Sequence, residues 1–91
     1  MIMINRVRNR KLKEIAKSTM NSLTGCTHVI YGLCYATPGG NIVEEVADNS
    51  SEMKYFYDET SFHECIDAIH TKYEDYGCKH LNIYAVHRNE L

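Results

Sequence analysis

Apolar and polar positions alternate with a helical period over residues 5–24. Leu12, Ile15, Ala16, Met20 and Leu23 fall three to four residues apart, so they form one apolar stripe along a helix. Most of the remaining positions in this stretch are polar or basic. Glycine is the usual helix terminator, and one follows at position 25. The pattern therefore predicts an amphipathic helix over residues 5–24.

Residues 27–36 are nearly all apolar and predict a β-strand. Strict alternation places the odd-numbered residues from Val29 to Tyr35 on one face and the even-numbered ones on the other. Because neither face is polar, we expect a central strand that is covered on both sides. Gly32 in the middle predicts a bulge or a close approach of another segment.

Turn residues then divide the chain into two further strands. In the segment 37–41, Pro38 presets φ for the first central position of a turn and Gly39 is suited to the positive φ that follows. A second strand is expected over residues 42–48. The polar cluster 48–51 predicts another turn, and a third strand follows over residues 52–57.

A second helix is predicted by its period and by its ends. Ser61 and Glu64 match the capping-box spacing, and apolar residues then recur with helical period up to Tyr76. Gly77 supplies the stop signal. Residues 79–87 alternate again and predict a last strand, with Leu81, Ile83 and Ala85 on one face.

These elements predict a single domain over residues 1–91, of the α+β class, with the order α-β-β-β-α-β. The expected architecture is a four-stranded, mostly antiparallel sheet packed with two helices, one or both of them on one face. Because the last strand follows a helical crossover, a mixed sheet with one parallel pair is the alternative.

The charge is divided unevenly along the chain. Residues 1–24 hold six basic residues and one acidic residue, for a net charge of +5, whereas residues 25–91 hold four basic and eleven acidic residues, for −7. The net charge of −2 conceals this asymmetry. Charged faces of opposite sign favour recognition of a partner over catalysis, although isolated charge runs are also typical of a solvated surface.

Two binding hypotheses follow from this asymmetry. In the first, an acidic surface formed within residues 44–75 occupies a basic surface of a partner protein, such as one that handles nucleic acid. Its predicted residues are Glu44, Glu45, Asp48, Glu52, Asp58, Glu59, Glu64 and Asp67. In the second, the first helix binds nucleic-acid phosphates through Arg6, Arg8, Arg10, Lys11, Lys13 and Lys17.

Cysteine and histidine recur two residues apart in three places, at positions 26 and 28, 63 and 65, and 78 and 80. Residues two apart on a strand share a face, so Cys26 with His28 and Cys78 with His80 would form a Cys2His2 zinc site if the first and last strands were neighbours. However, zinc sites usually separate paired ligands by two to four residues. We therefore predict no metal and no cofactor, and expect the four cysteines to fill the core as free thiols.

The case for an enzyme is weak. Glycine-rich phosphate loops and the Gly-x-Ser-x-Gly motif are missing from the sequence, and no cysteine stands where a helix N-terminus would activate it. His63, Asp67, His70 and Glu74 would line one side of the second helix, which suits proton transfer or metal binding, but also an ordinary exposed flank. A small zinc- or thiol-dependent enzyme is kept as the third hypothesis, without assigned catalytic residues.

One family resemblance is limited to the order of the elements. The order α-β-β-β-α is similar to that of double-stranded-RNA-binding domains, whose basic residues gather at the start of the second helix. Here the segment 58–64 is acidic, which would repel phosphate, so the assignment is rejected.

The sequence favours a small protein-binding module, for example an inhibitor of the kind that phages and mobile elements use. Seven Tyr and two Phe suit an interface. No run approaches the roughly 18 apolar residues of a membrane span, and the apolar start, Met1–Ile4, is too short for a secretory segment. We therefore expect a cytoplasmic protein that does not bind membranes, and a homodimer is an open alternative at this size.

Overall fold

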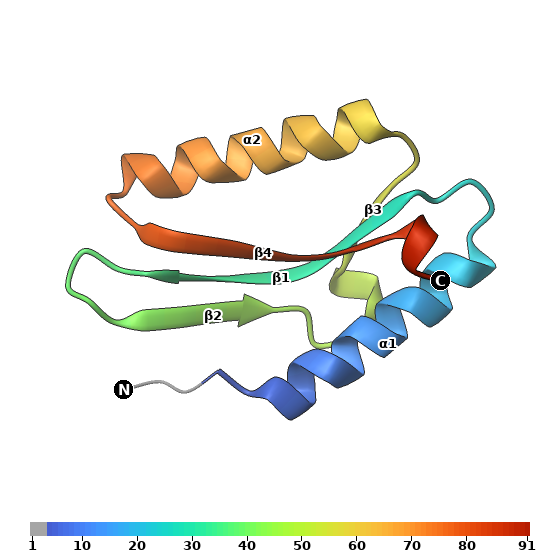
Figure 1. The fold of residues 1–91 in the computed structure, drawn as a ribbon, viewed down its shortest axis with the longest axis horizontal. Helices are drawn as coiled ribbons and strands as arrows, with labels where there is room; N and C mark the ends of the chain where they lie inside the picture. Colours follow the sequence, from blue (N-terminus) through green and yellow to red (C-terminus); the bar gives the residue numbers. More distant parts are fainter. Residues whose placement is uncertain (1–3) are drawn as a thin grey trace.

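The computed structural model describes residues 4–91 and contains two helices and a four-stranded antiparallel sheet in the order α-β-β-β-α-β (Figure 1). This confirms the predicted α+β class. The expectation drawn from the first residues, Met1–Ile4, lies mostly outside the described residues. The elements are α1 (Arg6–Ser22), β1 (His28–Ala36), β2 (Ile42–Val46), the short 3-10 helix η1 (Ser50–Glu52), β3 (Lys54–Phe56), α2 (Glu59–Asp75), β4 (Lys79–His87) and η2 (Arg88–Glu90).

Strand β1 is the centre of the sheet and pairs with all three other strands. Its residues 32–36 pair with β2 and its residues 28–30 pair with β3, so these two short strands share one edge, while β4 runs along the other edge. Every pairing is antiparallel, and the alternative of a mixed sheet is therefore wrong. The crossover helix α2 connects β3 to β4, which run in the same direction, but β1 lies between them.

A bulge at Tyr31 exchanges the two faces of β1. Ile30 and Gly32 face consecutive residues of β4, Ala85 and Tyr84, so Tyr31 is the extra residue. Tyr31 belongs to the core under α1, whereas Leu33, two residues later, lines a groove beside α2. The predicted bulge is confirmed, and the predicted single face from Val29 to Tyr35 is wrong for that reason.

The helices cover opposite faces of the sheet, so of the two expected arrangements, with one or both helices on one face, the arrangement with one helix on each face is observed (Figure 1). Helix α1 packs the core, with Leu12, Ala16 and Met20 buried against Val29 and Val86. These three helical positions belong to the stripe predicted from the sequence, and the sheet and its loops supply the other buried residues of the core.

Both ends of α1 are closed by polar groups. The Asn5 side chain caps the N-terminus by accepting the backbone N–H of Arg8 at 2.9 Å. At the other end, the Arg88 guanidinium donates to the carbonyl oxygens of Cys26, at 2.8 Å, and Met20, at 3.4 Å. Arg88 thus ties the end of β4 to the end of α1 and is a second donor to the Met20 carbonyl, which also accepts the Leu23 N–H at 3.0 Å.

The N-cap of α2 lies three residues before the one that the sequence predicts. The N-cap is Asp58, whose carboxylate accepts the backbone N–H of Ser61 at 2.7 Å and its hydroxyl at 2.9 Å. The predicted capping box of Ser61 and Glu64 is therefore wrong, because Ser61 serves as donor to the true cap. The predicted stop at Gly77 is confirmed by its φ of +75°.

No residue of α2 is buried, so the helix rests on the sheet through half-buried side chains. An aromatic pair holds each end. The Phe62 ring stacks on the His28 ring with centroids 4.0 Å apart, and the Tyr73 ring tilts against the Tyr35 ring at 4.7 Å. The aromatic pairs fasten the two ends of the helix, and half-buried apolar side chains lie between them.

The turn between β1 and β2 differs from the prediction at one residue. Gly40, not Gly39, has the positive φ, of +86°, and its N–H donates to the Thr37 carbonyl. The loop before β3 contains η1, which Asn49 caps through the Ser51 N–H. This extra turn shortens the third strand to residues 54–56 from the predicted 52–57.

Candidate functional site

Six of the eight predicted acidic residues already have a partner within the chain. Glu44 on β2 accepts hydrogen bonds from the Asn9 amide at 2.9 Å and from the Tyr84 hydroxyl at 2.7 Å. Glu45 faces the other side of the sheet and accepts from the Tyr73 hydroxyl at 2.8 Å. These two carboxylates connect β2 to both helices and to β4.

The carboxylates around η1 are also engaged. Asp48 forms an exposed ion pair with Arg8 on α1, at 2.7 Å. Glu52 accepts the backbone N–H of Asp48 at 2.7 Å. Asp58 is the N-cap of α2, and hydrogen bonds from Ser61 hold the pKa of Asp58 below its usual value. The last engaged residue, Glu59, belongs to a histidine cluster described below.

Glu64 and Asp67 are different, because within residues 4–91 their side chains make no hydrogen bond or ion pair. Glu74 and Asp75 share this property, and all four are exposed. At about 100° per residue, the four fall within an arc of roughly 100° on the side of α2 opposite its apolar side. We call Glu64, Asp67, Glu74 and Asp75 the acidic face of α2.

The predicted basic residues divide into two sets of three. Ion pairs engage Arg8 with Asp48, Lys13 with Glu90 at 3.6 Å, and Lys17 with Glu14 at 4.0 Å. The side chains that have no such pair within the described residues are Arg6, Arg10 and Lys11, all exposed. The basic character of α1 is thus partly neutralised inside the chain.

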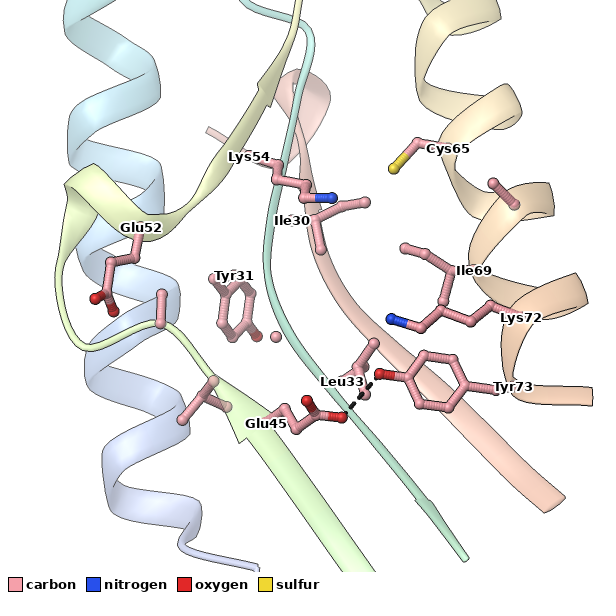
Figure 2. A pocket seen from close by; sticks show the side chains of 14 residues that line it. Ile30, Tyr31, Leu33, Glu45, Glu52, Lys54, Cys65, Ile69, Lys72 and Tyr73 are labelled. Carbon is pink, nitrogen blue, oxygen red and sulfur yellow. Dashed lines mark hydrogen bonds between the residues drawn. The ribbon is translucent and has the colours of Figure 1, made fainter. Parts of the chain in front are cut away.

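A groove of about 590 Å³ lies between α2 and the β2–β3 edge of the sheet (Figure 2). Ile30 and Leu33 of β1 and Ile69 of α2 contribute apolar surface, and the Lys54 and Lys72 ammonium groups point into it. The hydrogen bond from Tyr73 to Glu45 crosses one end of the groove. The groove explains why the middle of α2 buries no side chain.

Two tyrosines beside these carboxylates have strongly raised pKa values. Burial raises the pKa of Tyr73 and of Tyr84, and their hydrogen bonds to Glu45 and Glu44 raise it further. Cys34, beside Tyr84, contributes to the same effect. Both phenols therefore stay protonated and act as donors over the whole physiological range.

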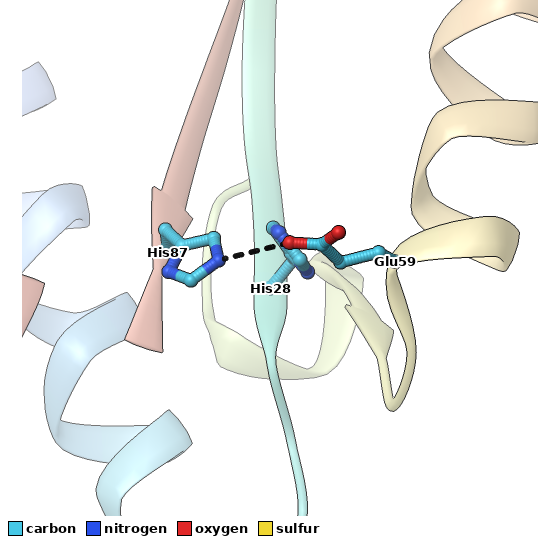
Figure 3. A group of neighbouring side chains, drawn as sticks. All are labelled: His28, Glu59 and His87. Atoms are coloured by element: carbon cyan, nitrogen blue, oxygen red, sulfur yellow. Dashed lines mark ion pairs between the residues drawn. The ribbon is translucent and has the colours of Figure 1, made fainter. Parts of the chain in front are cut away.

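The densest cluster of potential ligands joins three elements: His28 at the start of β1, His87 at the end of β4 and Glu59 at the start of α2 (Figure 3). One ring nitrogen of each histidine and one carboxylate oxygen all lie within 4.8 Å of one another. His87 Nε2 is 3.8 Å from Glu59 Oε1. The His28 and His87 rings meet edge to face, with centroids 4.3 Å apart.

Hydrogen bonds orient both rings. The Thr27 hydroxyl lies 3.3 Å from the Phe56 carbonyl oxygen and 2.8 Å from His28 Nδ1. When this hydroxyl donates to the carbonyl, it accepts from His28 Nδ1, and His28 Nε2 keeps its lone pair. Burial, together with the neighbouring His87, lowers the pKa of His28, which keeps that ring neutral. His87 Nδ1 accepts the Asn89 N–H at 3.0 Å, so its proton is on Nε2, towards Glu59.

The predicted cysteine–histidine pairs do not assemble into one site. Strands β1 and β4 are neighbours, but their antiparallel pairing places His28 opposite His87, whereas Lys79 at the start of β4 faces Ala36. Cys78 and His80 are therefore at the far end of the sheet from His28. In addition, His80 has a left-handed φ of +58°, which breaks the alternation that a shared face requires.

All four cysteines are free thiols. Cys26 and Cys34 are buried, in line with the predicted core role, whereas Cys65 and Cys78 are half-buried. Cys65 lines the groove beside α2 and therefore only partly fills that role.

The sequence reasoning missed His87 as a neighbour of His28. A histidine at the first position of one strand and another at the last position of a second strand meet when the strands pair antiparallel in register. Both histidine positions can be read from the sequence, but they predict a contact only when it is known that these two strands pair. The predicted stripe of His63, Asp67, His70 and Glu74 is exposed along α2, and it shows no hydrogen bond or ion pair within the described residues.

Within residues 4–91, neither helix has the length and apolar character needed to cross a membrane. A scan against protein-family models found no match, and searches of curated proteins and of solved structures likewise found none.

Proposed function

We propose that this protein is a binding module that uses the acidic face of α2 to occupy a basic surface of a partner protein. The observation that supports the proposal is the division among the carboxylates. Glu44, Glu45 and Asp48 are engaged inside the chain, whereas the four residues of the acidic face have no partner within residues 4–91. Carboxylates without internal partners are the ones available to a second protein.

The position of α2 supports the same proposal. The helix lies on the outside of the sheet (Figure 1). At its two ends, the Phe62 and Tyr73 rings pack against rings of β1. Its acidic face spans about 16 Å, at 1.5 Å per residue from Glu64 to Asp75. A rigid row of carboxylates of this length matches a row of Lys and Arg side chains, and complementary charge would accelerate association and give selectivity.

The proposal is tested by affinity capture from the native source, followed by binding measurements on the purified captured protein. The informative variant is Glu64→Gln with Asp67→Asn. Its matched control is Glu14→Gln with Asp48→Asn, which changes the net charge equally but lies on α1 and in the loop before η1. We expect the first variant to weaken binding by about tenfold, equivalent to about 1.4 kcal/mol, and the control to stay near the wild type.

Equal binding by both variants, or binding that does not weaken with added salt, would contradict the proposal. Exposed charges more than a Debye length apart are largely screened at high ionic strength, so salt dependence is a required property of such an interface.

A nucleic-acid-binding function is the second candidate, because Arg6, Arg10 and Lys11 are exposed and have no ion pair within the described residues. Neutralised phosphates release counterions, so such binding would weaken steeply with salt. A gel shift with generic DNA and RNA, compared with the triple variant Arg6→Gln, Arg10→Gln and Lys11→Gln, decides this. Clear binding that the variant abolishes would favour this candidate over the acidic face.

The remaining expectations stay predictions: an inhibitor role of the phage or mobile-element type, a cytoplasmic location and a homodimer. The zinc- or thiol-dependent enzyme, too, stays an untested alternative.

A further inference from the structure

We propose that His28, Glu59 and His87 form a binding site for a divalent transition-metal ion of the zinc class. Two imidazoles and one carboxylate are a ligand set typical of zinc, and three protein ligands leave one position for water. The proposal concerns a different part of the molecule from the acidic face, so each can fail independently of the other.

The ligand atoms are close to the required geometry. They lie within 4.8 Å of one another, whereas ligands around a tetrahedral zinc ion, at bond lengths of about 2.0–2.2 Å, are about 3.3 Å apart. The difference is within reach of side-chain rotation, because Glu59 is exposed and His87 is half-buried. Only His28 is fixed, by burial and by the stack with Phe62.

His28 is preorganised as the first ligand. In the tautomer with its proton on Nδ1, His28 donates to Thr27 Oγ1 across 2.8 Å, which is the outer hydrogen bond that metal-bound histidines usually make. Its Nε2 carries the free lone pair. The backbone carbonyl of Phe56 holds the Thr27 hydroxyl in turn, so a chain of two hydrogen bonds orients this ring.

His87 must change its hydrogen bonding when it binds the metal. Its Nδ1 accepts the Asn89 N–H, which places the ring proton on Nε2, the nitrogen that faces Glu59. On binding, the Nε2 proton leaves to solvent and Nδ1 takes up a proton from solvent, so the ring stays neutral. Nδ1 can then no longer accept from Asn89, so one of the two hydrogen bonds of the η2 capping box is lost, while Glu90 still accepts the His87 backbone N–H at 2.7 Å. Metal binding is therefore coupled to a weaker cap of η2.

The metal would also connect α2 to the sheet. Glu59 is the first residue of α2, which buries none of its side chains, whereas His28 and His87 belong to β1 and β4. A bound ion would hold α2 to the sheet at a third point, in addition to the aromatic pairs at the two ends of the helix. We therefore expect metal to raise the thermal stability of the domain.

The test is titration of reduced, metal-free protein with zinc chloride by calorimetry, with magnesium chloride as a comparison. The main variant is Glu59→Gln, which retains the shape of an exposed side chain and so leaves the fold intact. The matched controls are Glu64→Gln on the same helix and His70→Gln, an exposed histidine outside the cluster. Cys78→Ser reports on zinc held by thiols.

We expect one zinc ion per chain, no magnesium binding, and a loss of more than about tenfold in zinc affinity for Glu59→Gln, since even outer hydrogen-bond partners of metal ligands account for 10–100-fold. The controls and Cys78→Ser should bind as the wild type does. In addition, the amide resonance of Asn89 should shift on zinc binding.

The proposal is overturned by any of three results: no zinc binding, binding that Glu59→Gln leaves unchanged, or binding that Cys78→Ser removes. An Asn89 amide that does not move while zinc binds at the three ligands would overturn the coupling to η2.

Discussion

The Tyr84 hydroxyl donates a hydrogen bond to the Glu44 carboxylate at 2.7 Å. Tyr84 is on β4 and Glu44 is on β2, so this bond passes across the central strand β1 and ties the two edges of the sheet together. It also engages a carboxylate that the sequence had assigned to a partner surface. The contact is therefore structural, and of the predicted acidic residues only Glu64 and Asp67 have no side-chain partner within residues 4–91.

Loss of this hydroxyl should destabilise the fold. We expect Tyr84→Phe to lower the free energy of unfolding by about 1.5–3 kcal/mol, the range for a hydrogen bond to a charged group, because the half-buried Glu44 keeps only the Asn9 amide as donor. Urea denaturation measures this change. Tyr57→Phe is the control, since Tyr57 is exposed and its hydroxyl makes no hydrogen bond within residues 4–91. Equal stability of the two variants would show that the bond contributes nothing.

Alkaline pH should unfold the protein through ionisation of Tyr73 and Tyr84. The pKa values of Tyr73 and Tyr84 are raised above 10.0 in the folded state, chiefly by burial, so the unfolded chain loses these protons first. Their contribution is complete below the unfolded pKa near 10 and is lost progressively as the pH rises above it. The part of the tyrosinate absorbance that belongs to Tyr73 and Tyr84 should appear together with the loss of the circular-dichroism signal. Tyrosinate absorbance that rises fully while the fold persists would contradict the assignment.

Gly32 allows β1 and β2 to approach each other closely. A Cβ at this position would lie 2.6 Å from Val46 Cγ1 and 2.8 Å from the Glu45 carbonyl oxygen. Because backbone cannot yield as a flexible side chain does, we expect Gly32→Ala to cost about 1–3 kcal/mol in thermal or chemical unfolding. The matched variant is Gly39→Ala in the turn, where the nearest atoms are at ordinary contact distance, 3.8 and 3.9 Å. It should be close to neutral, and a comparable loss there would refute the steric explanation.

The start of α2 depends on Asp58 and not on the motif predicted from the sequence. We expect Asp58→Ala to expose the free N–H groups of the first turn and to raise the amide exchange rates over residues 59–63 severalfold. Glu64→Gln should leave those rates unchanged, because Glu64 takes no part in the cap. Hydrogen exchange followed by NMR distinguishes the two. A larger effect of Glu64→Gln than of Asp58→Ala would contradict the Asp58 cap and would support the capping box of Ser61 and Glu64.

Local signals in the sequence predicted the order of the elements. Most of the features that they did not predict depend on contacts between segments far apart in the chain. The apolar stripe of Leu12, Ala16 and Met20 and the stop signal at Gly77 act over a few residues, so they can be recognised without knowledge of the fold. Helix α1 ends at Ser22 with Leu23 as its C-cap, two residues before the predicted end at residue 24. The last strand was placed at its exact bounds, residues 79–87, because a glycine and a clear alternation delimit it.

The errors have physical causes of two kinds. At Asp58 and Ser61, two capping residues stand three positions apart, and their order along the chain cannot show which one accepts and which one donates. At Tyr31, a single extra residue exchanges the faces of the rest of β1. Gly32 indicated a bulge or a close approach, but the faces were still assigned by strict alternation along the whole strand. The cluster of His28, Glu59 and His87 was missed because it depends on long-range contacts. Its residues meet only when β1 pairs with β4 and α2 packs on the sheet.

The most direct test of the proposed function is NMR chemical-shift mapping of the isotopically labelled protein, titrated with the purified protein that it captures. The account predicts that the largest shifts cluster at Glu64, Asp67, Glu74 and Asp75, and that they decrease as salt is added. Shifts confined to α1, around Arg6, Arg10 and Lys11, would contradict it and would place recognition on the basic helix.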